Sequence, residues 1–183
     1  HYSKDGQAGL EEETDSDTVA RLAGVEPTRI LPEAYRLKML AAPHLSARLD
    51  NVTIDPAFLR PPRLDGPLVI EGAGGHLVPL TGRVLFVDIF ARWQIPLVLC
   101  ARTALGTINH TLLSLEALRQ RAIPVQGVVF IGDEDRENQR VISNIGAVRP
   151  LGRLPRLADL TSDALHQAFA QHFNLADFLE APE

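Results

Sequence analysis

Several residue types that often carry structure or chemistry are scarce in this chain. Among its 183 residues are one cysteine, one methionine and one tryptophan, and only two of its 18 basic residues are lysines, Lys4 and Lys38. Cys100, the single cysteine, cannot form an internal disulfide, which is typical of proteins from a reducing compartment. The first residues, 1–5, have no apolar signal core. We therefore expect a soluble, cytoplasmic protein.

Long hydrophobic runs are also missing. The most apolar stretch, residues 84–101, is interrupted by an aspartate, an arginine, a glutamine and a proline, which excludes a membrane-spanning helix. The formal net charge of −5 argues against a general nucleic-acid-binding surface. With 45% hydrophobic and 22% charged residues, the composition is that of a globular protein. The length predicts a single domain over residues 1–183.

Neither lysine lies in a phosphate-binding loop. Such a loop needs the order Gly-Lys-Ser/Thr, because backbone amides, the lysine and the hydroxyl act together on phosphate and magnesium. Lys4 is followed by Asp5 and Lys38 by Met39. The sequence therefore contains no P-loop.

What the sequence does contain is a series of short, continuous apolar runs. Leu68–Ile70, Leu97–Ala101 and Val125–Ile131 are typical of strands covered on both faces, as in a parallel sheet. Helical spacing of apolar residues follows the first two runs, over 86–93 and 108–118. This alternation predicts an α/β fold with a doubly wound, mostly parallel sheet in which the three strands are neighbours.

The first half of the chain is more polar. We expect short helices over Glu33–Leu40 and His44–Asp50, and an acidic, solvated loop over Glu11–Asp17 that caps a helix over Thr18–Ala23.

In a parallel sheet, ligands bind beyond the carboxyl ends of the strands. Glu71 directly follows the first apolar run, where a carboxylate can hold a hard cation such as Mg²⁺. A strand end with a flexible glycine turn is an equally good interpretation. After the second run, Gly106, Thr107 and Asn109 can form a helix start that attracts an anion, although simple N-capping by Thr107 explains the pattern as well.

Other candidate residues give weaker evidence of a functional site. The six histidines do not have the spacing of metal ligands, and His110 has no serine or cysteine nucleophile beside it. Cys100 is expected to be a buried, small hydrophobic residue of its strand.

Six short motifs occur in an order and spacing that resemble the dethiobiotin synthetase family. They are Lys4-x-x-Gln7-Ala8-Gly9, Ser16-Asp17, Ala42-Pro43-His44, Glu71-Gly72-Ala73-Gly74-Gly75, Leu105-Gly106-Thr107-Ile108-Asn109-His110 and Leu151-Gly152-Arg153-Leu154-Pro155. The resemblance covers residues 4–157. It implies a P-loop-NTPase-like fold and an enzyme that uses ATP to close the ureido ring of dethiobiotin in biotin synthesis.

The resemblance also implies roles for individual residues. Lys4 is expected to be the catalytic lysine, which stabilises the carbamate and the transferred phosphate. Asp17 and Glu71 are the implied Mg²⁺ partners. Contacts with the nucleotide are implied for Asp17, Glu71, Gly72, Ala73, Gly74, Pro155, Arg156 and Leu157. Contacts with the substrate are implied for Ala8, where the family often has a hydroxyl, and for Gly106, Thr107 and Asn109.

The implied substrates are 7,8-diaminononanoate, CO₂ or bicarbonate, and ATP with Mg²⁺. A homodimer is implied because Gly106, Thr107 and Asn109 resemble a helix start that binds the substrate's carboxylate from the neighbouring subunit. In the family, an asparagine at the position of Ile131 often binds the adenine base. The backbone groups of Ile131 and Gly132 could replace that asparagine.

The family opens with a strand, a P-loop and a helix, so a unit of about 30 residues would be missing before Lys4. We therefore expect the 183-residue chain alone to show little synthesis. Two alternatives stay open: a non-catalytic homologue without a P-loop that acts as a ligand-binding or dimerisation module, and a related amidotransfer synthetase of the cobyrinic acid type.

Overall fold

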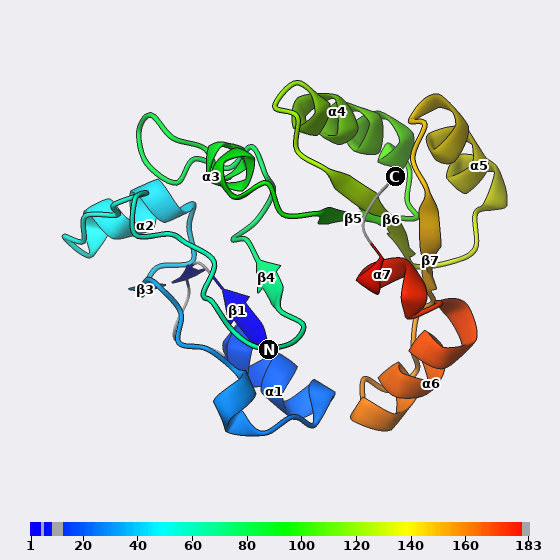
Figure 1. Ribbon diagram of the computed structural model, residues 1–183, viewed down its shortest axis with the longest axis horizontal. Coiled ribbons are helices and arrows are strands. Elements are labelled where there is room, and N and C mark those ends of the chain that lie inside the picture. The colour runs from blue at the N-terminus through cyan, green and yellow to red at the C-terminus, as the bar shows by residue number, and fades with distance from the viewer. Residues whose placement is uncertain (5, 9–12, 181–183) are drawn as a thin grey trace. The chain divides into compact units, whose positions relative to one another are not determined.

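The computed structural model describes residues 1–4, 6–8 and 13–180 (Figure 1). The chain divides into two compact units, His1–Trp93 and Gln94–Glu183, each with its own strands and its own core. The expectation of a single domain stays a prediction. None of the helices in the described ranges has the length and apolar character needed to cross a membrane.

The first unit contains short elements. Its strands are β1 (Tyr2–Lys4), β2 (Gln7–Ala8), β3 (Arg36–Leu37) and β4 (Val69–Glu71). Its helices are α1 (Asp15–Ala23), the 3-10 turn η1 (Pro27–Arg29), α2 (Pro43–Leu49) and α3 (Phe86–Trp93). β1 pairs in parallel with β4, and β2 pairs in parallel with β3. A buried cluster that includes Leu37, Leu80, Phe86 and Ile89 forms the core of this unit.

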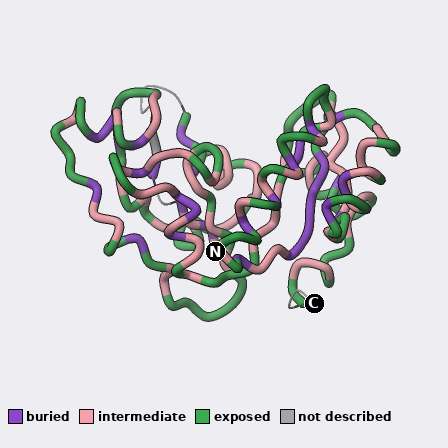
Figure 2. The backbone as a smooth tube through the Cα atoms, turned by 90° about the horizontal axis from the view of Figure 1, so that it is seen from above, coloured by how far each residue is buried: buried purple, intermediate pink, exposed green. Residues whose placement is uncertain are grey.

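The second unit has longer strands. β5 (Leu97–Arg102), β6 (Val125–Ile131) and β7 (Pro150–Leu154) form a parallel sheet in the order β5-β6-β7. The helices are α4 (Thr107–Arg119), α5 (Arg136–Ile145), α6 (Ser162–His172) and α7 (Ala176–Leu179). Figure 2 shows β6 as a continuous buried stretch, since Gln126–Phe130 are all buried.

Packing in the second unit depends on one glycine in β6. A Cβ atom at Gly127 would lie 2.6 Å from the carbonyl oxygen of Arg149 and 2.6 Å from Cγ of Leu151. The absence of a side chain therefore allows β7 to approach β6 closely. The nearby core combines Ala101, Leu115 and Ile142 with Val128 and Phe130 of β6.

The predicted α/β fold with parallel strands is confirmed, as are helices α3 and α4 and the pairing of the second and third apolar runs. The strand of the first apolar run is β4, which ends at Glu71 instead of before it. β4 pairs with β1, and its place beside β5 stays a prediction. It is also less covered than expected, since Val69 is 64% exposed.

Three other expectations from the sequence are wrong. Residues 33–40 contain no helix: Arg36 and Leu37 form β3, because pairing with β2 and burial of Leu37 outweigh the local helical pattern. Helix α1 begins at Asp15, three residues before the expected start at Thr18. Cys100 is exposed, because side chains alternate along β5 and Ala101 is the one that is buried. Glu11 and Glu12 of the acidic run lie outside the described residues.

Candidate active site

A buried lysine lies at the end of β1, where the parallel pairing puts it beside the end of β4. Lys4 is opposite Glu71 in the register, and only 4% of its surface is exposed. Its Nζ donates hydrogen bonds to Oε1 of Glu71 at 2.8 Å and to Oδ2 of Asp15, the first residue of α1. Burial alone lowers the pKa of Lys4, but the hydrogen bonds to the two carboxylates outweigh it and raise the pKa above its usual value. Lys4 therefore stays charged at neutral pH.

Tyr2 completes this group of side chains from the same strand. Residues two apart on a strand face the same side, and the Tyr2 hydroxyl donates to Oε2 of Glu71 at 2.8 Å. Burial, followed by the hydrogen bond to Glu71, raises the pKa of Tyr2 well above its usual value. We call Tyr2, Lys4, Asp15 and Glu71 the lysine cluster.

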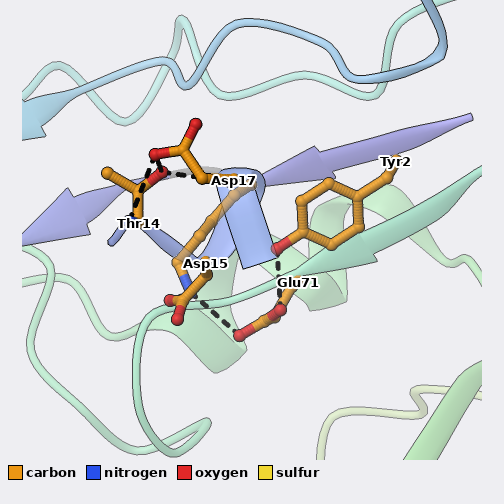
Figure 3. A network of polar contacts seen from close by, with 6 residues as sticks. Tyr2, Thr14, Asp15, Asp17 and Glu71 are labelled. Atoms are coloured by element: carbon orange, nitrogen blue, oxygen red, sulfur yellow. Dashed lines mark hydrogen bonds and ion pairs between the residues drawn. The ribbon is translucent and has the colours of Figure 1, made fainter. Parts of the chain in front are cut away.

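Asp17, the other carboxylate that the resemblance implies for Mg²⁺, takes part in the cap of α1. Its Oδ2 accepts from the backbone amide of Thr14 at 3.2 Å and from the Thr14 hydroxyl at 2.6 Å, while its own amide donates to that hydroxyl at 3.2 Å. This capping box closes the first turn of α1. Figure 3 shows the Asp17 carboxylate directed at Thr14, whereas Asp15 and Glu71 converge at the other end of the group.

Sequence reasoning missed both Asp15 and Tyr2 as site residues. A usable signal existed for Tyr2, because it lies two positions before Lys4 and must share its face of the strand. Asp15 belongs to an acidic run, and the sequence gives no reason to prefer one acidic residue of that run over another. Only the position at which α1 begins shows that Asp15 is the one that bonds Lys4.

The lysine cluster has the donor types that suit Mg²⁺ bound together with a nucleotide. Mg²⁺ in such sites is usually held by one or two carboxylates, with substrate phosphates and water as the other ligands. The side chains of Asp15 and Glu71 are 51% and 46% exposed, so each carboxylate has a face toward solvent while it binds Lys4. In the described ranges no three His, Cys, Asp or Glu side chains form an all-protein metal site.

The glycine-rich turn after β4 combines a close packing contact with a backbone that favours glycine. A Cβ atom at Gly72 would lie 3.0 Å from Cζ of Phe90, and Gly74 has a φ of +76°. Ala73, between them, packs against the core of the first unit. This turn therefore begins directly at the lysine cluster and is anchored on α3.

In the second unit, Gly106 is the N-cap of α4, with a φ of +90°. The expectation that Thr107 caps this helix is wrong: Thr107 is the first helical residue, is 8% exposed and donates its amide to the carbonyl of Ala104 at 3.0 Å. Asn109 is exposed. A recess in this unit lies between the end of β5 and the start of α4, with Cys100, Arg102, Gly106, Thr107, His110 and Ser114 among its lining residues.

The ends of β6 and β7 lie side by side. The carbonyl of Ile131 accepts from the Thr103 amide at 2.9 Å, the amide of Gly132 donates to the Leu154 carbonyl at 2.9 Å, and the carbonyl of Gly132 accepts from Arg153 at 2.7 Å. The backbone groups that the sequence suggested for reading a base are therefore already engaged within the protein.

Residues 155–157 follow β7 directly. Pro155 and Leu157 are half-buried, and Arg156 is exposed and forms an ion pair with Asp133 at 3.2 Å. Of the sequence-predicted site residues, the structure thus joins Lys4 and Glu71 through a hydrogen bond. It puts Ala8 in β2, opposite Leu37, and Gly9 of the same motif lies outside the described residues.

Comparison with known proteins identifies the family. The AAA domain family matches residues 1–164. The ATP-dependent dethiobiotin synthetase BioD of Agrobacterium fabrum is 82% identical over the whole of this chain and 86% of its own length. Proteins of the same name from Rhodopseudomonas palustris and Nitrobacter hamburgensis are 63% and 58% identical, each over 99% of this chain and 85% of the relative. The chain therefore belongs to the ATP-dependent dethiobiotin synthetase family.

Proposed function

We propose that the chain supplies the catalytic lysine for the ATP-dependent conversion of 7,8-diaminononanoate and CO₂ to dethiobiotin. CO₂ adds to one amine to form a carbamate, ATP phosphorylates the carbamate, and the second amine closes the ring with release of phosphate. The observation that carries the proposal is the ammonium group of Lys4, which is buried and held in place by two carboxylates.

A fixed cation suits this chemistry. Phosphoryl transfer spreads negative charge over the transferred oxygens, and a positioned ammonium group stabilises that charge without reorganising at the moment of reaction. Because Asp15 and Glu71 hold Lys4, its Nζ has a defined position and stays protonated. Glu71 is the proposed Mg²⁺ partner, and a bound Mg²⁺ would neutralise part of the charge on the ATP phosphates. Asp17 remains a candidate second carboxylate.

The nucleotide is proposed to contact the turn Gly72–Gly74 and the segment Pro155–Leu157. The base then lies near Ile131, which has no polar side chain to read it. Since the backbone groups of Ile131 and Gly132 named above are engaged, we expect weak discrimination between nucleobases.

A homodimer is proposed for the substrate site. Gly106, Thr107 and Asn109 surround the start of α4, where a helix N-terminus attracts a carboxylate. If this helix start binds substrate held by a neighbouring subunit, sedimentation at micromolar concentration should give a dimer, and a monomer would contradict the shared site. A cytoplasmic location stays a prediction from the sequence.

The test uses this chain preceded by the amino-terminal strand, P-loop and helix of a dethiobiotin synthetase relative; we call this protein the extended enzyme. ADP release with diaminononanoate, bicarbonate and MgATP should fall about 10³-fold or more in Lys4→Ala. Lys38→Ala is the matched control, because Lys38 is the second lysine of the chain and is exposed. Equal activity of the two variants would contradict the role of Lys4, whereas an extended enzyme that releases no ADP with diaminononanoate and bicarbonate would favour a non-catalytic module.

A further inference from the structure

The hydroxyl of Tyr2 has a defined partner. Tyr2 is 7% exposed, and its hydroxyl donates to Oε2 of Glu71 at 2.8 Å (Figure 3). The backbone pairing aligns Tyr2 with Val69, two residues before Glu71. The contact therefore joins side chains from the two paired strands, although the residues are 69 positions apart in the sequence.

Both oxygens of the Glu71 carboxylate accept hydrogen bonds from β1. Oε1 accepts from Lys4 and Oε2 accepts from Tyr2, each at 2.8 Å. Two donors on different oxygens restrict rotation about the last bond of the glutamate side chain, which is otherwise a soft torsion. The side chain of Glu71 is still 46% exposed, so the carboxylate is oriented from the protein side and remains accessible to solvent.

We infer that Tyr2 is a positioning residue, whose hydroxyl orients the carboxylate of Glu71 for the cation that accompanies the nucleotide. The inference rests on the proposed role of Glu71 as the Mg²⁺ partner. Groups that hydrogen-bond a metal ligand fix its orientation, and their loss weakens metal affinity about 10- to 100-fold. Lys4 bonds Oε1 of Glu71, and the Tyr2 hydroxyl adds the bond to Oε2, so the second oxygen is fixed by Tyr2.

The experiment measures Mn²⁺ binding to the extended enzyme in the presence of ADP by electron paramagnetic resonance. Tyr2→Phe keeps the ring and its packing but removes the donor, and Mn²⁺ affinity should fall about 10-fold. Tyr35→Phe is the matched control: Tyr35 is the second tyrosine of the chain, lies in the same unit and bonds the backbone of Asp55. This control should leave the affinity unchanged within about twofold.

A purely structural role for Tyr2 gives a different pattern. In that case, Tyr2→Phe would lower the melting temperature and leave Mn²⁺ affinity like that of Tyr35→Phe, which would overturn the inference. Replacing Tyr2 with p-aminophenylalanine returns a donor at the end of the ring and should restore the affinity. Failure of this rescue in a folded protein would also count against an orienting hydrogen bond.

Glu71→Gln separates the inference from the proposed function. If Glu71→Gln leaves Mn²⁺ affinity unchanged, the proposed metal role of Glu71 is wrong. If Glu71→Gln weakens binding but Tyr2→Phe does not, Glu71 keeps its role and only the inference about Tyr2 fails.

Discussion

The strands β1 and β4 of the first unit and the sheet of the second unit have different surroundings. In the first unit, β1 and β4 have three residues each and end in the charged side chains of the lysine cluster. In the second unit, β5, β6 and β7 have five to seven residues and are covered by an apolar core. The second unit's sheet is therefore stabilised mainly by packing, whereas polar side chains join β1 to β4 in the first unit.

The largest expected effect on stability comes from a change in the apolar core of the second unit. Phe130 is 2% exposed in β6, and Phe130→Ala should lower the free energy of unfolding by about 3–5 kcal/mol, because it removes a buried ring and leaves a cavity. Phe58→Ala makes the same change at a side chain that is 78% exposed in the first unit. That variant should stay within about 0.5 kcal/mol. Denaturant unfolding measures both, and equal losses would contradict the contribution of the buried core around β6 to stability.

A smaller effect is expected where a helix cap supports the site. Thr14 is 4% exposed, and its hydroxyl accepts from the Asp17 amide in the capping box that starts α1. Thr14→Ala should cost about 1–2 kcal/mol, at the upper end for cap removal. Thr161→Ala removes an exposed cap of α6 in the second unit and should cost about 0.5 kcal/mol.

Thr14→Ser serves as a second control for this prediction. It keeps the hydroxyl, so urea unfolding should give nearly the stability of the unchanged protein. If Thr161→Ala costs as much as Thr14→Ala, the capping box adds nothing beyond a single cap.

The smallest expected effect is the pH dependence of the lysine cluster. The pKa values of Lys4 and Tyr2 are raised in the folded chain, so above pH of about 10 the folded state binds more protons than the unfolded state. Their contribution to stability is therefore complete below that pH and is lost as the pH rises further. Because the side chains of Asp15 and Glu71 are about half-exposed, solvent screening keeps this contribution to stability small.

Unfolding of the unchanged protein and of Lys4→Met between pH 6 and pH 11 measures this contribution. The stability difference between the two should be constant up to pH of about 9 and should shrink above about 10. A difference that changes between pH 6 and pH 8 would contradict the assignment to Lys4.

The sequence predicts the second unit better than the first, for a physical reason. The apolar runs of β5 and β6 and the helical spacing of α4 are long enough to indicate a period. β3 has only two residues, so its strand nature depends on pairing with β2 and has no local signal. The exposure of Cys100 depends on which face of β5 is covered, and an unbroken apolar run does not contain that information.

Prediction of the candidate site from the sequence has the same limit, because it also depends on where short elements begin and end. Motif resemblance selected Lys4 and Glu71, which the structure joins at 2.8 Å although they are 67 residues apart. It selected Asp17, which forms hydrogen bonds with Thr14, and passed over Asp15, which binds Lys4. The choice between two aspartates in one helical turn depends on where α1 begins, and helix starts are among the least certain features of a sequence.

The most direct test of the central claim is to follow carbon from bicarbonate into product. The extended enzyme is incubated with ¹³C-bicarbonate, 7,8-diaminononanoate and MgATP, and dethiobiotin is detected by mass spectrometry together with ADP. We expect one labelled carbon per dethiobiotin, equal amounts of dethiobiotin and ADP, and loss of both in Lys4→Ala. ADP release without labelled dethiobiotin, or labelled product that survives Lys4→Ala, would contradict the proposed function.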